Sequence, residues 1–203
     1  MRHDASGASR LGGRLIFLIG PSGSGKDSLI DAARAQLLEN GVEVARRVIT
    51  RSAESRGEAA HGVSPEAFEQ MREGGAFAMH WQANGLQYGI PVQVNEWLSS
   101  GRHVLVNGSR GYLPEARRRY PHLLAIRLEV APQVLRQRLL ARGRETAEQI
   151  EQRLARNALL QIGDTQGVHV LDNSTSLADT VEALLHLLTE EGVIEVGGMA
   201  PAV

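Results

Sequence analysis

Short apolar runs alternate with amphipathic stretches along most of the chain. Five runs rich in Val, Ile and Leu have the length of strands buried on both faces: 14–20, 42–50, 103–107, 123–130 and 167–172. Helical patterns lie between them, the clearest at 25–39, 132–162 with an interruption near Gly143, and 177–190. The alternation predicts an α/β fold with a parallel five-stranded sheet and helices on both faces.

The segment from about 51 to 100 departs from this alternation. Ser64 and Pro65 are typical of a helix start, and two apolar runs flank Asn84-Gly85 as in a hairpin. We expect a small inserted lobe over the carboxyl edge of the sheet, where ligands of open α/β sheets bind. The chain then forms one domain over 13–190, with a disordered N-terminus (1–12) and a flexible tail (191–203).

Composition excludes several classes of function. The 203 residues carry a formal net charge of −1, which gives no general attraction to nucleic acid or to an anionic membrane. Cysteine is absent, which removes disulfides and thiolate metal sites. No apolar run is long enough to span a bilayer, and the polar N-terminus lacks the apolar core of a signal peptide. These features predict a cytoplasmic protein with small-molecule partners, and they leave monomer and homodimer open.

The stretch "GPSGSGKDS" has the glycine spacing of a phosphate-binding loop and lies directly between a strand and a helix. Glycines let successive backbone N–H groups point at phosphate oxygens, and the helix N-terminus adds partial positive charge. Of the 22 Lys and Arg residues, the single lysine is in this loop. The loop predicts an ATP site formed by Gly20, Pro21, Ser22, Gly23, Ser24, Gly25, Lys26, Asp27 and Ser28.

Asp27 stands where the motif has Ser or Thr. A carboxylate at a helix start gains about 0.3–1 kcal/mol from the helix dipole. Repulsion by a phosphate oxygen 4 Å away costs roughly 4 kcal/mol per unit charge. A cation must therefore separate them, and we expect Mg²⁺ bound by Asp27 directly or through water, with Ser28 as a helper. The later strand "HVLVN" ends without an acid, so the metal-binding carboxylate has moved to the loop.

Arginines surround the interruption at Gly143 and predict a lid over about 138–156. They are Arg138, Arg142, Arg144, Arg153 and Arg156. Phosphoryl transfer depends on neutralising charge on the moving group, which a mobile arginine lid supplies. The alternative is a solvated helix surface whose arginines pair with nearby glutamates.

From about 14 to 190 the sequence resembles the guanylate kinase-like nucleoside monophosphate kinases. The segments "GPSGSGKDSL", "ITRSAESRGE", "NGLQYGIP" and "ARGRETAEQIEQRL" carry the resemblance. Within that group "GKDS" and "VNGSRGYLPEAR" are most similar to the ribose 1,5-bisphosphate phosphokinases. This resemblance implies transfer of phosphate from ATP to ribose 1,5-bisphosphate, giving 5-phosphoribosyl 1-diphosphate for phosphonate degradation. The alternatives are the activity of a guanylate kinase or other nucleoside monophosphate kinase, and a non-catalytic guanylate kinase-like interaction module.

The resemblance also assigns individual residues. Lys26 and the lid residues Arg142, Arg144 and Arg153 would neutralise the transferred group, while Arg138 and Asn173 would contact the nucleotide. The acceptor would be bound by two sets of residues: Arg51, Arg56 and Tyr88 for a phosphate, and Asn107, Ser109 and Arg110 near the ribose. Guanylate kinases have acidic residues at this strand that bind the purine of the acceptor. The segment "VNGSR" has no acidic residue, which is consistent with an acceptor that has no base.

Overall fold

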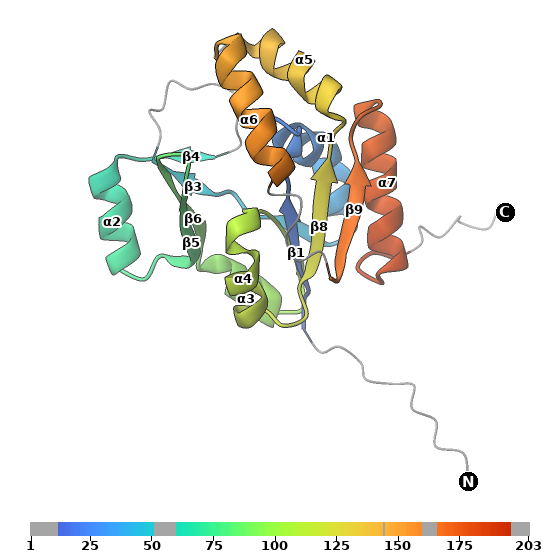
Figure 1. Ribbon diagram of the computed structural model, residues 1–203. Coiled ribbons are helices and arrows are strands. Elements are labelled where there is room, and N and C mark those ends of the chain that lie inside the picture. The colour runs from blue at the N-terminus through green and yellow to red at the C-terminus, as the bar shows by residue number, and fades with distance from the viewer. Residues whose placement is uncertain (1–11, 51–59, 144, 160–165, 196–203) are drawn as a thin grey trace, which may run out of the picture.

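The computed structural model describes residues 12–50, 60–143, 145–159 and 166–195. Its main sheet has five parallel strands in the order β2-β7-β1-β8-β9. The strands are β1 (Leu15–Ile19), β2 (Val42–Val44), β7 (His103–Asn107), β8 (Leu124–Glu129) and β9 (Val168–Asp172). The predicted α/β fold with a parallel five-stranded sheet is therefore confirmed (Figure 1).

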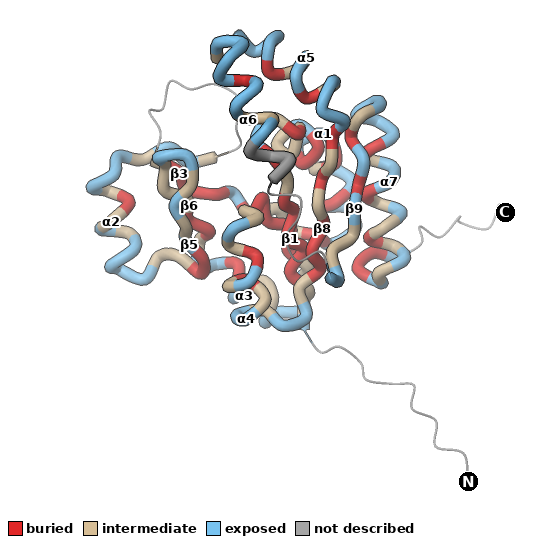
Figure 2. Tube along the Cα trace, in the orientation of Figure 1, coloured by how far each residue is buried: buried red, intermediate tan, exposed pale blue. Residues whose placement is uncertain are grey.

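Helices cover both faces of the main sheet. On one face α1 (Lys26–Glu39) and α7 (Leu177–Glu190) bury their apolar stripes against β1, β7, β8 and β9. On the other face α3 (Gln93–Ser99) and α4 (Leu113–Arg119), which follows the short 3-10 helix η1 (Arg110–Tyr112), pack on β1 and β7. β1 has no exposed residue because it lies between these two cores (Figure 2).

A second sheet forms the inserted lobe, with strand order β4-β3-β6-β5. Its elements are β3 (Val48–Ile49), β4 (His61–Gly62), α2 (Pro65–Glu73), β5 (Phe77–Ala83) and β6 (Leu86–Pro91). Ser64 caps α2 by accepting a hydrogen bond from the Ala67 N–H, and Asn84 and Gly85 turn the hairpin with positive φ. In Figure 1 the lobe stands to the left of the main sheet.

The apolar run 42–50 is not one strand. Its first part, β2, pairs with β7 in the main sheet, whereas its last part, β3, pairs with β6 and β4 in the lobe. Between them Ala45 still donates to the Leu105 carbonyl, while the Arg47 carbonyl already accepts from His61. Both halves are equally apolar, so the sequence did not reveal that the chain changes sheets. The lobe therefore begins at Val48 and not at residue 51.

The region predicted to form a lid contains two helices, α5 (Pro132–Arg142) and α6 (Ala147–Leu159). Gly143 ends α5 in the left-handed conformation, with φ of 63°. Leu135 and Leu139 of α5 pack against Ile150 of α6 in a small core of their own. In Figure 1 the two helices lie above the carboxyl ends of the main strands.

The chain beyond α7 departs from the expected flexible tail. The turn at Gly192 folds residues back, and Val193 and Ile194 are buried in the core with α1 and α7. Glu191 forms an ion pair of 2.9 Å with Arg14 at the other end of the domain. Apolar burial thus extends the domain to residue 194. The rest of the predicted tail, from residue 196 onward, lies outside the described residues.

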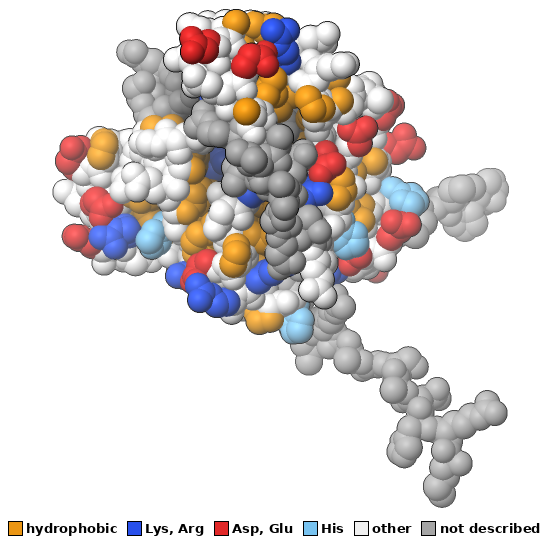
Figure 3. Space-filling model, viewed as in Figure 1, with side chains coloured by type: hydrophobic (Ala, Val, Ile, Leu, Met, Phe, Trp, Pro, Cys, Tyr) orange, Lys and Arg blue, Asp and Glu red, His pale blue; other side chains and the backbone are white. Residues whose placement is uncertain are grey.

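The surface carries charges of both signs. In Figure 3 acidic and basic side chains are interspersed over the face in view, in keeping with the net charge of −1. Within the described residues, no helix has the length and apolar character needed to cross a membrane.

Candidate active site

The phosphate loop connects β1 to α1 at the carboxyl edge of the main sheet. Gly23 and Gly25 have φ of 91° and 93°, a conformation that side chains with Cβ rarely adopt. A Cβ on Gly25 would also lie 2.6 Å from Nδ2 of Asn173. Gly25 is the N-cap of α1 and has no side chain to accept from the first-turn N–H groups. The loop is therefore shaped for an external anion at the helix N-terminus.

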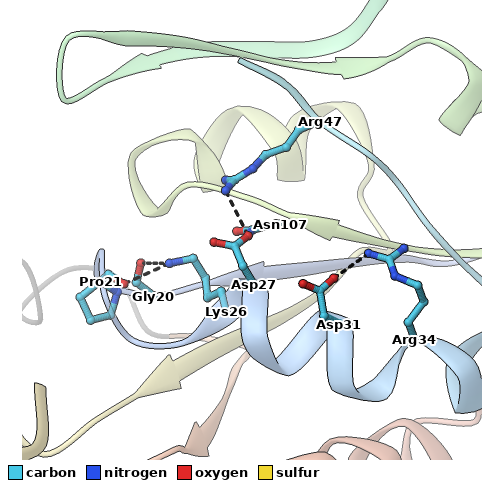
Figure 4. Close-up of polar contacts among 8 residues, drawn as sticks. All are labelled: Gly20, Pro21, Lys26, Asp27, Asp31, Arg34, Arg47 and Asn107. Atoms are coloured by element: carbon cyan, nitrogen blue, oxygen red, sulfur yellow. Dashed lines mark hydrogen bonds and ion pairs between the residues drawn. The ribbon is translucent and has the colours of Figure 1, made fainter. Parts of the chain in front are cut away.

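Lys26 lies across its own loop. Its Nζ donates hydrogen bonds of 2.9 Å and 3.0 Å to the carbonyls of Gly20 and Pro21. Figure 4 shows the side chain directed toward these carbonyls, away from the neighbouring Asp27. The only lysine of the chain is thus held against the backbone of the glycine loop, and its predicted contact with phosphate oxygens stays a prediction.

Asp27 is the centre of a polar cluster. Its Oδ1 accepts from Nδ2 of Asn107 at 2.6 Å and from Nη2 of Arg47 at 3.3 Å. Asn107 ends β7 and is buried, whereas about one third of the Asp27 side chain is exposed. The other amide atom, Oδ1 of Asn107, is buried without a hydrogen-bond partner within the described part of the chain. The cluster brings together a partly exposed carboxylate and an amide whose oxygen has no partner among the described residues. Both oxygens are hard donors of the kind that Mg²⁺ prefers.

Aromatic residues connect this cluster with the lobe. The Arg47 guanidinium lies over the ring of Tyr88, with Cζ 5.3 Å from the ring centroid. Tyr88 stacks on Trp81 with 5.7 Å between the ring centroids, and the ring centroids of Trp81 and Tyr112 are 5.4 Å apart. Arg47 therefore lies between Tyr88 of the lobe and Asp27 of the loop.

Residues far along the chain contact the backbone of Ser24 in the loop. Its carbonyl accepts from Nδ2 of Asn173 at 2.7 Å and lies 3.5 Å from Nη1 of Arg138. The Oδ1 of Asn173 accepts from Oγ1 of Thr180 at 2.9 Å, so both ends of this amide are hydrogen-bonded. Asn173 is 2% exposed. In this arrangement the residue holds the loop, and its predicted contact with the nucleotide stays a prediction.

Two arginines of the predicted lid reach the loop: Arg138 at Ser24 and Arg153 at Ser22. Nη1 of Arg153 donates to Oγ of Ser22 at 3.0 Å, and Nη2 lies 2.6 Å from Oε1 of Glu145. The structure therefore combines the two interpretations of the lid: Arg153 pairs with a glutamate and also touches the loop. Arg142 is exposed at the end of α5.

The remaining predicted residues fall into two groups. Ser28 is exposed on α1, and Ser109 and Arg110 follow β7 in partly buried positions. Burial lowers the pKa of Arg110 from its ordinary value, and the nearby Arg127 lowers it further. Others lie outside the residues whose side chains the structure describes: Arg51, Arg56, Arg144 and Arg156.

Arg47 is the residue of this cluster that the sequence did not single out. It follows Arg46 within the apolar run 42–50. The structure exposes Arg46 and buries Arg47, which is 9% exposed. A charged residue inside an apolar run was the available signal, because side chains alternate between the two faces of an extended segment.

The fold and the loop together define a class, that of P-loop phosphotransferases with a second, inserted sheet. The family model for guanylate kinase matches residues 12–191. Ribose 1,5-bisphosphate phosphokinase PhnN of Azotobacter vinelandii is 64% identical over 178 residues, which cover 88% of this chain and 97% of that protein. The chain belongs to the guanylate kinase family and, within it, to the ribose 1,5-bisphosphate phosphokinases.

A relative of lower identity carries the same name, and a solved structure shares the fold. The protein of the same name from Thiobacillus denitrificans is 47% identical over 180 residues, covering 88% of this chain and 94% of that protein. Among solved structures, guanylate kinase from Anaplasma phagocytophilum superimposes with a TM-score of 0.68 at 20% identity, over 89% of this chain and 86% of that one. This last likeness concerns the fold.

Proposed function

We propose that this protein transfers the γ-phosphoryl group of ATP to the 1-phosphate of ribose 1,5-bisphosphate, giving 5-phosphoribosyl 1-diphosphate and ADP. The observation that carries the proposal is the contact between the loop carboxylate of Asp27 and the strand-end amide of Asn107. It supports a phosphate loop whose metal-binding acid lies on the loop. The identity of 64% to a relative named for this activity supports the choice of acceptor. The product would serve phosphonate degradation.

The donor half of the site binds ATP. Loop N–H groups at the start of α1 and the Lys26 ammonium would hold the phosphates, because both direct positive charge into the concave loop. Arg153 and Arg142 of the lid, with Arg144, would neutralise charge on the transferred group. The contact between Arg153 and Ser22 supports this role, since it brings a lid cation to the rim of the loop.

The residues present fit Mg²⁺. Asp27 offers a partly exposed carboxylate, Asn107 a buried amide oxygen with no described partner, and Ser28 a hydroxyl at the next position of the helix. When bound, the ion would screen the negative charge of the phosphates from Asp27 and from the attacking group. Without a cation, the carboxylate would repel the nucleotide.

The acceptor half lies between the loop and the lobe. Tyr88, together with Arg51 and Arg56, would bind a phosphate, while Ser109 and Arg110 would lie near the ribose. An oxygen of the 1-phosphate attacks the γ-phosphorus, the bond to the bridging oxygen breaks, and ADP leaves with the bonding electrons. The attacking oxygen is anionic near neutral pH, so the reaction needs no general base.

Coupled ADP-release assays test the proposal. The purified protein should use ribose 1,5-bisphosphate as the better acceptor, and the product should carry a diphosphate at carbon 1 by ³¹P NMR. Faster ADP release with GMP would instead make the protein a guanylate kinase. Failure to bind ATP at all would favour the non-catalytic interaction module.

A further inference from the structure

A buried guanidinium lies at the boundary between the two halves of the site. Arg47 belongs to the connection between β2 and β3, where the chain passes from the main sheet to the lobe. Its side chain touches the loop at Asp27 and the lobe at the ring of Tyr88. Figure 4 shows it extending toward the Asp27 carboxylate, on the opposite side from the loop carbonyls that bind Lys26. Arg47 therefore contacts both the donor side and the acceptor side.

The ion pair between Arg47 and Asp27 is a loose one. Nη2 of Arg47 lies 3.3 Å from Oδ1 of Asp27, whereas charge-assisted hydrogen bonds between nitrogen and oxygen are usually about 2.7–2.9 Å. The Arg47 side chain is 11% exposed. A contact of this length joins the two charges less tightly than a short charge-assisted hydrogen bond does. The contact between Arg47 and Asp27 can therefore be exchanged for a contact with another anion.

The proposed function, on which this inference rests, supplies a competitor of Arg47 for the Asp27 carboxylate, namely Mg²⁺. Asp27 Oδ1 accepts from Arg47, and the same carboxylate would hold Mg²⁺. A divalent ion bound there would offset the negative charge that attracts Arg47. The guanidinium would then be drawn to another anion within reach.

The attacking phosphate supplies that anion. It carries about −1.5 to −2 charges near neutral pH and must approach the negative γ-phosphoryl group. The lid cations Arg138 and Arg153 contact the loop at Ser24 and Ser22, on the donor side. Arg47 reaches the same region from the lobe, beside Tyr88. It is thus placed to reduce the repulsion between the two substrates.

We propose that Arg47 binds the attacking phosphate of the acceptor, and that it exchanges Asp27 for this phosphate when Asp27 binds the metal. Arg47 is then a substrate-binding residue that couples metal binding to acceptor binding. Its neighbour Arg46 offers a matched control, because Arg46 is exposed and contacts the carbonyl of Ala60 at 3.4 Å.

Isothermal titration calorimetry with ribose 1,5-bisphosphate tests the assignment without metal or nucleotide. Arg47→Gln should weaken acceptor binding about 10- to 100-fold, the range for hydrogen bonds to charged groups. Arg46→Gln should leave it unchanged. Arg47→Lys, which retains the charge and loses the planar fork, should fall between the two. Thermal unfolding and ATP binding of each variant would separate a binding effect from loss of the fold.

A double-mutant cycle tests the exchange itself. Asp27→Asn removes the competing carboxylate, so metal-free acceptor binding should tighten about two- to five-fold, the value of an ion pair partly open to water. In the Arg47→Gln background the same change should have no effect. A structural role for the pair predicts no such tightening. Unchanged or weaker binding by Asp27→Asn would overturn the exchange, and normal binding by folded Arg47→Gln would overturn the assignment.

Failure of the proposed function would look different. The wild-type protein would then neither bind nor phosphorylate ribose 1,5-bisphosphate, whatever the variants do. If GMP proves to be the acceptor, the same cycle with GMP decides the role of Arg47, because the attacking group is again a phosphate.

Discussion

Nδ2 of Asn107 donates a 2.6 Å hydrogen bond to Oδ1 of Asp27, which joins the end of β7 to the first turn of α1 across 80 residues of sequence. An acidic side chain at position 107, at the end of β7, would thus lie almost where the Asp27 carboxylate of the loop lies. In this chain the loop has the acid and the strand has the amide.

Asp27→Ser should raise the magnesium concentration needed for half-maximal activity by at least about ten-fold, the lower bound seen when even an outer partner of a metal is removed. The reason is loss of the carboxylate that balances the ion. Steady-state rates over a magnesium titration measure the effect. Asp31→Asn is the control, since Asp31 lies one turn along α1 and pairs with Arg34 at the surface (Figure 4). An unchanged magnesium requirement in Asp27→Ser would refute the metal assignment.

Moving the acid back to the strand should rescue the defect. The double variant Asp27→Ser/Asn107→Asp should recover part of the magnesium affinity lost in Asp27→Ser, because the two side chains are in hydrogen-bond contact. Asn107→Asp alone should destabilise the fold, since two carboxylates would then face each other. The same titration, with urea unfolding of each variant, provides the measurement. If the double variant is no better than Asp27→Ser, the two positions are not equivalent.

Arg153→Gln should lower kcat about 100- to 1000-fold, the usual loss when one group that stabilises the transition state is removed. The KM for the acceptor should change little, because Arg153 contacts the loop at Ser22. Arg136→Gln serves as the matched lid variant: Arg136 pairs with Glu151 at the surface. Its kcat should stay within about two-fold of the wild type, because exposed ion pairs contribute little. Equal losses in both variants would indicate damage to the lid rather than a contact with substrate.

Asn173→Ala should lower the free energy of unfolding by about 1–3 kcal/mol, because it removes two buried hydrogen bonds. These are the bonds of Asn173 to the Ser24 carbonyl and to the Thr180 hydroxyl. Urea unfolding measures the change, and ATP affinity should fall with it as the loop loses its support. Asn95→Ala removes an exposed amide that accepts from Tyr120, so it should cost less than about 0.5 kcal/mol. Comparable costs for the two variants would show that Asn173 is not a specific support.

The sequence by itself determined the elements whose causes are local. Five apolar runs predicted the strands of the main sheet, and Asn84-Gly85 predicted the hairpin of the lobe. The phosphate loop was readable because glycine spacing, a preceding strand and a following helix all lie within one short stretch. Backbone freedom and amphipathic periodicity act over a few residues, so they leave a pattern in the letters.

Only the tertiary structure decided which distant residues meet. The strand order β2-β7-β1-β8-β9 brings Asn107 to Asp27, and it brings Asn173 to Ser24 across 149 residues. It also divides the run 42–50 between two sheets, and so buries Arg47 beside the loop while Arg46 faces solvent. Strand pairing depends on how whole faces bury against one another, and the apolar pattern of a single segment does not name its partner.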